Sequence, residues 1–254
     1  MTTRPTPASG RRRSGSSTST SADPSVSRRF DALLFAAGGV LLLPDPTVLG
    51  PLLAYYGGDP SIDAHRRAHY AAMAAKSTAG AVEADWFTYD MAYVRSVGVA
   101  DNDMTEAAEL LGKSRHAPLW RWVIPESRAA LDRLAAAGIP MGVVSNASGQ
   151  IEAVLARETC QVGDGPHVAM RVIVDSDVVG VAKPDPAIFD HALPHFAEFD
   201  RARIAYVGDS VTMDIASARG AGLHPILVDP HDDHADADFE RIVSLTQLAD
   251  ELTA

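Results

Sequence analysis

The amino-acid sequence predicts an α/β protein, built on a doubly wound, mostly parallel sheet with a helical cap inserted after the first strand. Two observations support this fold class. Short, almost continuously apolar runs alternate with helix-like stretches, which is typical of a parallel sheet covered by helices on both faces. The alternation stops between residues 45 and 123, where the sequence indicates several helices and no convincing strand. An insertion at this point lies above the carboxyl ends of the strands, where open α/β sheets bind ligands.

Each element of the core follows from a local pattern. Apolar runs predict strands at 32–35, 139–144, 203–207 and 223–228. The intervals predict helices at 126–137, 149–158, 186–195 and 214–221. Gly138 and Gly222 lie just past two of these helices, where helix stop signals belong. In the cap, helices are expected at 65–76, 84–97 and 104–112.

Composition excludes several classes of protein. The chain has 254 residues, 46% of them hydrophobic, which is enough for one large domain with a sizeable insertion. The single cysteine, Cys160, rules out an intramolecular disulfide framework and favours a reducing compartment, so we expect the cytoplasm. No uncharged apolar run reaches the ~18 residues of a membrane span. The net charge of -11 argues against nucleic acid as a partner of the folded part, and no membrane partner is expected.

Residues 1–29 differ from the rest of the chain. They carry six arginines against one acid, Asp23, and are rich in Ser, Thr and Pro, which predicts a disordered basic tail. The segment Ser27-Arg28-Arg29-Phe30 before an apolar run resembles a twin-arginine export signal. However, no small-residue cleavage site follows, and cleavage would delete the first predicted strand. We therefore favour a solvated leader over an export signal.

Polar side chains follow successive predicted strands at the point where each strand ends. Ser145 and Asn146 follow one strand, Lys183 precedes a helix start, and Asp209 and Asp214 follow another strand. A parallel sheet brings such positions together, so the hydroxyl and the ammonium can hold a phosphate and the carboxylates can hold Mg²⁺. Each residue alone has an ordinary explanation as a helix cap, a turn or a loop. Their order and spacing together favour a binding site.

This pattern resembles the haloacid dehalogenase superfamily of phosphatases and related hydrolases, in its helical-cap subgroup, across residues 30 to 229. Ser145-Asn146 resembles the second motif, which holds the phosphoryl group, and Lys183 resembles the third, which neutralises charge. Asp209 and Asp214 resemble the fourth motif, which binds Mg²⁺. The resemblance implies a Rossmann-like core from residues 30–44 and 124–254, with the cap at 45–123.

The first motif departs from the family pattern, which is an apolar strand followed by Asp-x-Asp-Gly-(Thr or Val). This chain has Ala36-Ala37-Gly38-Gly39-Val40, so Ala36 stands at the nucleophile position and Gly38 at the acid/base position. A methyl group cannot attack phosphorus. Gly38 keeps only its backbone carbonyl, which the family uses as a metal ligand. Asp31 is expected ~16 Å away at the other end of the strand, and nothing in the spacing supports Asp45 as a replacement.

We therefore expect a protein of this fold that has lost phosphoaspartate chemistry and binds a phosphorylated or anionic ligand, or that serves as a protein-interaction module. The alternatives are an active Mg²⁺-dependent hydrolase with a non-standard nucleophile, and substitutions introduced to trap a ligand. Mg²⁺ is expected to bind weakly, because Asp209, Asp214 and the Gly38 carbonyl are the remaining ligands.

Other residues are weaker candidates. The acidic and histidine-rich segment 231–238 and the pair His191 and His195 have metal-ligand character, but a solvated loop and ordinary histidines are favoured. The cap residues at 65–69 are candidates for setting substrate charge preference. The aromatic residues of the cap are interpreted as core rather than as a ligand platform: Trp86, Tyr93, Trp120 and Trp122.

Overall fold

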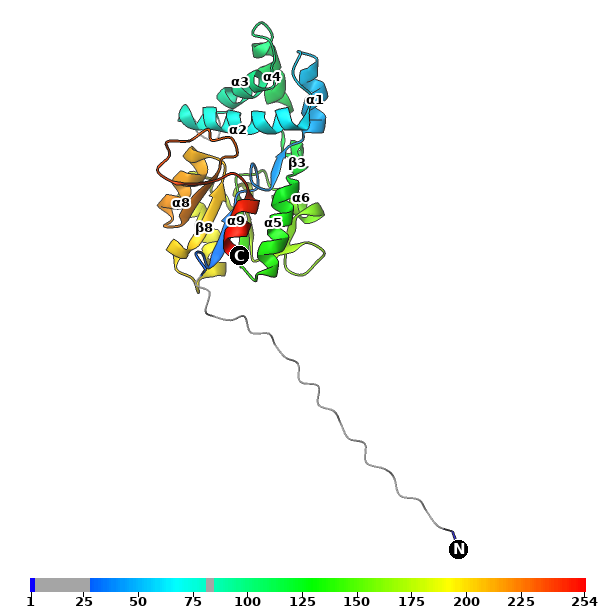
Figure 1. Cartoon of the computed structure of the whole chain (residues 1–254), viewed down its shortest axis with the longest axis vertical. Helices are drawn as coiled ribbons and strands as arrows, with labels where there is room; N and C mark the ends of the chain where they lie inside the picture. The colour runs from blue at the N-terminus through cyan, green and yellow to red at the C-terminus, as the bar shows by residue number, and fades with distance from the viewer. Residues whose placement is uncertain (3–27, 81–84) are drawn as a thin grey trace.

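The computed structural model describes residues 1–2, 28–80 and 85–254. Its centre is a six-stranded sheet in the order β10-β9-β8-β1-β4-β7, in which every neighbouring pair is parallel. The strands are β1 (Ala32–Phe35), β4 (Met141–Ser145), β7 (Ile173–Asp175), β8 (Ile204–Gly208), β9 (His224–Val228) and β10 (Glu240–Ile242). This arrangement confirms the predicted α/β class with a mostly parallel sheet (Figure 1).

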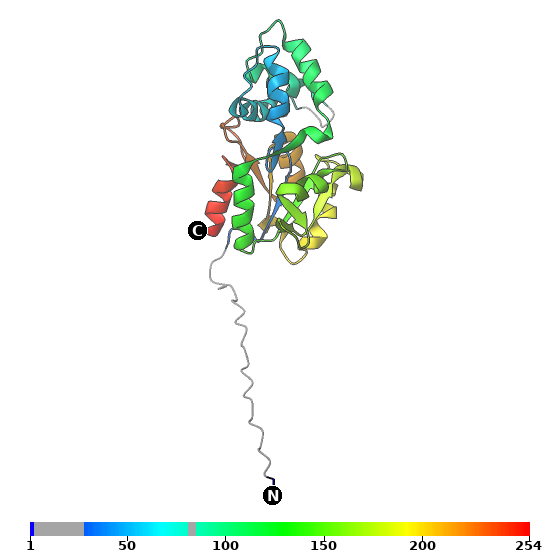
Figure 2. The same ribbon diagram turned by 90° about the vertical axis from the view of Figure 1, so that its right-hand side faces the viewer.

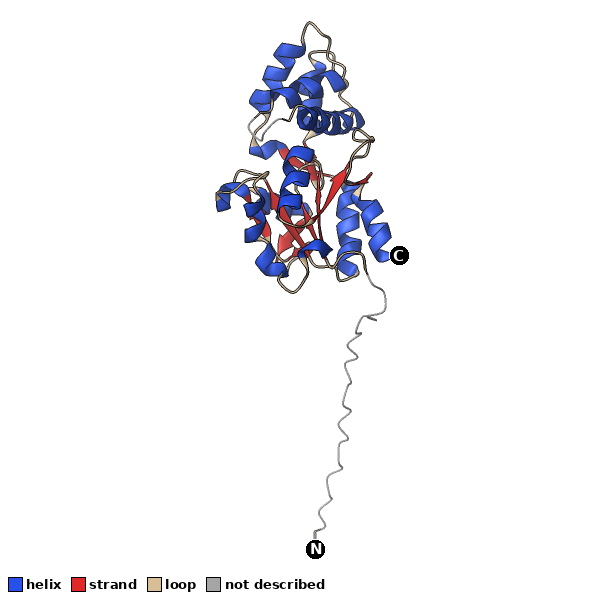
Figure 3. Cartoon of the chain, turned by 90° about the vertical axis from the view of Figure 1, so that its left-hand side faces the viewer, coloured by secondary structure: helices blue, strands red, loops and turns tan. Residues whose placement is uncertain are grey.

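Helices flank the sheet on both sides (Figure 3). On one side α5 (Pro125–Ala136) packs beside the C-terminal α9 (Leu245–Thr253), as Figure 2 shows. The other core helices are α6 (Ile151–Glu158), α7 (Ser176–Val179) and α8 (Ala216–Gly220). Because both faces are covered, the central strand β1 is completely buried, with Leu33, Leu34 and Phe35 each 0% exposed.

In the part of the chain that the structure describes, the cap helices lie above the core (Figure 1). They are α1 (Pro46–Ala54), α2 (Ile62–Thr78), α3 (Phe87–Ser96) and α4 (Met104–Ser114). The side chains of Asp45 and Ser61 cap the first turns of α1 and α2. Buried cap residues form an apolar cluster separate from that of the core. A two-stranded antiparallel ribbon, β2 (Leu42–Pro44) with β3 (Trp120–Val123), carries the chain into and out of the cap.

Several elements differ from the sequence predictions. The expectation that the segment 45–123 contains no strand was wrong, because β3 lies at its end. The expected helix at 186–195 is two 3₁₀ segments, Pro186–His191 and Leu193–Phe196, since Pro194 lacks the N–H that a continuous helix needs. The stretch expected to be helical at 214–221 begins earlier, as a π-helical turn at Val211–Ile215 that leads into α8.

The remaining short elements lie at the margins of the core. A small parallel pair joins β5 (Cys160–Val162) to β6 (Val168–Met170), and two 3₁₀ turns occupy Ala117–Leu119 and Arg201–Arg203. Residues 3–27 of the predicted tail lie outside the described residues. Arg28 and Arg29, at the end of the predicted tail, contact the core through the Ala137 carbonyl and Glu240. No helix in the described part of the chain is long and apolar enough to span a bilayer.

Candidate anion-binding site

The candidate site lies where β1, β4 and β8 end, beneath the cap. Ala36 follows β1, is 3% exposed, and donates its backbone N–H to the Val207 carbonyl at 2.8 Å. Its methyl group thus lies at the edge of the sheet, beside the end of β8. A pocket of about 390 Å³ opens there, lined by core and cap residues that include Ala36, Gly38, Ser145, Asn146, Lys183, Asp209 and Asp214. The structure therefore brings all seven candidate site residues of the sequence to one pocket.

Gly39 fixes the path of the loop that follows Ala36. Its φ is +68°, and a Cβ at this position would lie 1.9 Å from Oδ2 of Asp209. Only glycine combines that backbone conformation with so close an approach. A side chain at position 39 would collide with Asp209, so glycine is required at this turn.

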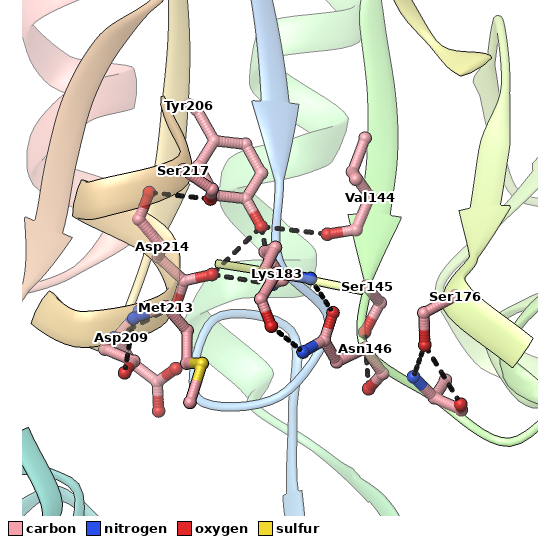
Figure 4. A network of polar contacts seen from close by, with 12 residues as sticks. Val144, Ser145, Asn146, Ser176, Lys183, Tyr206, Asp209, Met213, Asp214 and Ser217 are labelled. Atoms are coloured by element: carbon pink, nitrogen blue, oxygen red, sulfur yellow. Dashed lines mark hydrogen bonds and ion pairs between the residues drawn. The ribbon is translucent and has the colours of Figure 1, made fainter. Parts of the chain in front are cut away.

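Lys183 belongs to a buried polar network that Figure 4 shows from close by. Its Nζ donates to Oδ1 of Asp214 at 2.6 Å and to the Tyr206 hydroxyl at 2.8 Å. The Tyr206 hydroxyl lies 2.8 Å from the Val144 carbonyl, and burial raises the pKa of this phenol well above its ordinary value, so it stays protonated. An ammonium has three N–H donors, so Lys183 has one more than these two bonds require.

Asp214 accepts hydrogen bonds on both carboxylate oxygens. Oδ1 accepts from Lys183 and lies 3.1 Å from the Tyr206 hydroxyl, while Oδ2 accepts the backbone N–H groups of Asp209 and Ser210 at 3.0 Å each. The Asp214 carboxylate therefore links the Lys183 side chain to the backbone of the loop that follows β8. Its role in this geometry is to position Lys183 and the loop after β8.

The Asn146 side chain holds the loop that carries Lys183. Its Oδ1 accepts the Lys183 backbone N–H at 2.8 Å, and its Nδ2 donates to the Lys183 carbonyl at 3.0 Å. Ser145 is 4% exposed, and the contact described for its hydroxyl is a long 3.4 Å approach to the Asn146 carbonyl. That hydroxyl is therefore available to a ligand at little cost in existing hydrogen bonds.

Asp209 is held by a residue of the cap. Its Oδ2 lies 2.9 Å from Nε2 of His69, and Nδ1 of His69 lies 2.9 Å from the Tyr89 hydroxyl. His69 is 1% exposed. Burial raises the pKa of the Asp209 carboxyl, and the hydrogen bond from His69 opposes this rise. The sequence pointed to 65–69 as candidates, but only the fold shows that His69 reaches a pocket residue.

The other cap candidates have different roles. His65 is buried against the Tyr93 hydroxyl within the cap. Arg66 and Arg67 form ion pairs with Glu126 and Asp233 of the core. These pairs attach the cap to the core and do not line the pocket, so the expectation that they set ligand charge is not supported.

Trp120 was interpreted as core, and the structure places it in the pocket wall directly over Gly38. A Cβ built on Gly38 would lie 3.0 Å from Cζ3 of the indole. The ring thus occupies the space in which a side chain at position 38 would start. The sequence gives no sign of this contact, because residues 38 and 120 are joined only through the β2–β3 ribbon.

The donor set does not fit a resident Mg²⁺ ion. Of the four carboxylate oxygens of Asp209 and Asp214, three already accept hydrogen bonds from described residues. The Ala36 side chain offers no oxygen, and one carboxylate oxygen together with the Gly38 carbonyl falls short of the near-octahedral oxygen coordination that Mg²⁺ requires. Within the described ranges no group of three or more His, Cys, Asp or Glu side chains is placed to hold a metal, which also disfavours the 231–238 segment.

The fold and pocket define a class: α/β proteins with a Rossmann-like core and a helical cap over a site at the carboxyl ends of the strands. Residues 40–222 match the family model described as haloacid dehalogenase-like hydrolase, and the chain belongs to this family. The match begins at Val40, immediately after Gly38 and Gly39.

Curated relatives include haloacid dehalogenase-like hydrolase domain-containing protein 3 of Bos taurus, 31% identical over 144 residues, which are 56% of this chain and 55% of the relative. Phosphoserine phosphatase of Thermus thermophilus is 30% identical over 151 residues, which are 58% of this chain and 57% of that protein. The chain thus spans about half the length of these curated relatives. The family is related to phosphatases.

Solved structures share the fold. A dehalogenase described with an intermediate complex has a TM-score of 0.55 at 17% identity and covers 90% of this chain and 100% of its own. The HAD-hydrolase YfnB from Bacillus subtilis, described as bound to magnesium, has a TM-score of 0.53 at 18% identity and covers 89% and 100%. At these identities the likeness concerns the fold alone.

Proposed function

We propose that this chain binds a phosphorylated or other anionic small molecule and does not carry out phosphoryl transfer through an aspartyl intermediate. It would then be a pseudoenzyme of the haloacid dehalogenase-like hydrolases. One observation carries the proposal: the pocket has a methyl group, that of Ala36, where β1 ends beside Ser145 and Lys183. A methyl group is no nucleophile, and Gly38 cannot supply the ~10²–10⁴-fold of a general acid/base.

Neither acid considered as a replacement nucleophile faces the pocket. Asp31 lies before β1 and accepts from the Arg203 guanidinium at 2.6 and 2.8 Å. Asp45 accepts from Thr47 and from Arg121, and these bonds outweigh the effect of burial and lower the pKa of its carboxyl. Both carboxylates are engaged in hydrogen bonds outside the pocket, so neither is placed to attack a ligand, which supports a non-catalytic function.

The residues that remain suit an anion. Ser145 offers a hydroxyl donor, and Lys183 offers a charge-assisted donor, the stronger kind of hydrogen bond. Without a carboxylate at position 36 or 38, the pocket repels an anion less, so a compensating metal is less needed. We expect Mg²⁺ to bind weakly and the anion to bind in its absence.

The test is a melting curve of the full chain with inorganic phosphate and no divalent metal. Ligand at 100 times its Kd stabilises the fold by ~2.7 kcal/mol, which is about 5–11 °C for a domain of this size. Ser145→Ala should remove most of this gain, because it deletes a ligand donor and only one long internal contact. Ser127→Ala is the matched control, since Ser127 is an equally buried serine on α5 away from the pocket.

A second assay addresses catalysis directly. Purified protein is assayed for Mg²⁺-dependent hydrolysis of sugar phosphates and nucleotides, and no turnover above the buffer rate is expected. Turnover that depends on Ser145 would overturn the non-catalytic assignment and favour a hydrolase with another nucleophile. An equal phosphate-induced shift in the Ser145→Ala and Ser127→Ala variants would show that phosphate binds elsewhere.

A further inference from the structure

The pocket has a second cation, which comes from the cap. Arg115 follows α4, lines the same pocket as Lys183, and has a side chain that is 16% exposed. Nothing in the local sequence marked Arg115 as functional. Its position means that a ligand in the pocket meets one positive charge from the core and one from the cap.

The Arg115 guanidinium is fixed before any ligand arrives. Nη1 donates to Oδ1 of Asp90, which is 4% exposed, and the guanidinium carbon lies 4.6 Å from the centre of the Trp86 ring. Nζ of Lys76 lies 3.7 Å from the same ring, so Trp86 is itself held in place. A guanidinium immobilised in this way loses little conformational entropy on binding, which favours planar, charge-assisted recognition of an oxyanion.

The guanidinium retains hydrogen-bonding capacity. It has five N–H donors, and one of them is used in the bond to Asp90. Because the side chain lines the pocket, other donors can reach a ligand there. A ligand with no acceptor at this point would cover these donors without replacing their bonds to water, which disfavours its binding.

The volume and the walls of the pocket fit a ligand larger than one phosphate. Its volume of about 390 Å³ lies in the range of small-molecule sites. This is many times the ~30 Å³ that one water molecule occupies in the liquid. Trp120 and Met73 give the walls apolar surface, which suits a short hydrocarbon segment between two polar ends.

We propose that Arg115 is a second anion-binding residue and that the ligand is a small molecule with two acidic groups joined by a short apolar segment. Ser145 and Lys183 hold one acidic group, and Arg115 holds the other. This assignment rests on the proposed anion-binding function and specifies the class of its ligand.

The test compares two matched series of phosphonates, which cannot be hydrolysed as phosphate esters. One series has a terminal carboxylate (phosphonoacetate, 3-phosphonopropionate and 4-phosphonobutyrate), and the other has a methyl group in its place (ethyl-, propyl- and butylphosphonate). By calorimetry on the full chain, the best carboxylate-bearing compound should bind at least ten-fold more tightly than its methyl counterpart. Arg115→Met should abolish this preference by weakening the binding of the carboxylate-bearing compounds, and it should not weaken the binding of the alkylphosphonates.

Lys113→Met is the matched control, because Lys113 is a neighbouring cation with a 77% exposed side chain that does not line the pocket. It should keep the ten-fold preference. Equal affinity for both series in the wild type would overturn the two-acid ligand while leaving anion binding intact. Failure of phosphate and of every phosphonate to bind would instead refute the proposed function. If Arg115→Met does not fold, Arg115→Lys serves in its place. This variant keeps the charge without the planar guanidinium and should lose most of the preference for the carboxylate-bearing compounds. If it kept the whole preference, the role of Arg115 would be overturned.

Discussion

Placing aspartates at positions 36 and 38 tests the proposed absence of catalysis and whether these two positions alone account for it. The change is Ala36→Asp with Gly38→Asp. At position 38 the new Cβ would lie 3.0 Å from Cζ3 and 3.4 Å from Cε3 of Trp120. The carboxyl group adds three further heavy atoms beyond that point. Trp120 has little freedom to move away, since its ring packs on His69 at 5.6 Å and on Trp86 at 6.3 Å.

The expected cost follows from this crowding. Overpacking destabilises a fold by ~1–3 kcal/mol, which corresponds to about 2–12 °C in the melting temperature of a domain of this size. In a double-mutant cycle, Gly38→Asp should cost ~1–3 kcal/mol less in the Trp120→Ala background than in the wild type. Trp122→Ala is the control, because Trp122 lies on the same strand but does not line the pocket.

Activity provides the second measurement, with an aryl phosphate as substrate and millimolar Mg²⁺. We expect no turnover from the Ala36→Asp/Gly38→Asp variant, because the indole occupies the space that the acid/base needs. Adding Trp120→Ala should give measurable turnover, and adding Trp122→Ala should not. The reasoning fails if Gly38→Asp costs the same in both backgrounds, or if the two-site variant turns over as fast as the variant that also lacks Trp120.

Three further predictions concern metal, buried charge and the thiol. Mg²⁺ at millimolar concentration should stabilise the chain little, and a submicromolar dissociation constant by calorimetry would contradict the donor count at Asp209 and Asp214. Asp214→Asn should destabilise the fold by ~3–5 kcal/mol in urea titrations, because it leaves Lys183 without its buried partner. Burial raises the pKa of the Cys160 thiol to about 12 from 9.0. Cys160 therefore contributes stability that is fully present below pH 9 and is lost as pH rises from 9 to 12, and Cys160→Ala should flatten the fall in melting temperature across that window.

The sequence was sufficient to predict the centre of the fold. The strands β1, β4 and β8 are almost continuously apolar because helices cover both faces of the sheet, and β9 ends in the apolar run Ile226–Val228, so each gives a visible signal. The edge strands β7 and β10 have three residues each, and they are too short to give such a signal.

The candidate site could be predicted in the part that the core contributes. Ser145, Lys183 and Asp209 each stand at a strand end or a helix start, so topology alone brings them together. The cap contribution could not be predicted. Arg115 follows α4 and Trp120 lies on β3, and both reach the pocket only through the way the cap and the β2–β3 ribbon pack on the core, which no local sequence pattern indicates.

The cap shapes the space around Gly38 and Asp209. Trp120 lies over Gly38, and His69 binds Oδ2 of Asp209. The indole therefore occupies the position in which a side chain at residue 38 would start, and the imidazole contacts an oxygen that a metal ion would otherwise approach. Both contacts agree with the proposed function, in which the pocket holds an anion and needs no carboxylate at position 38.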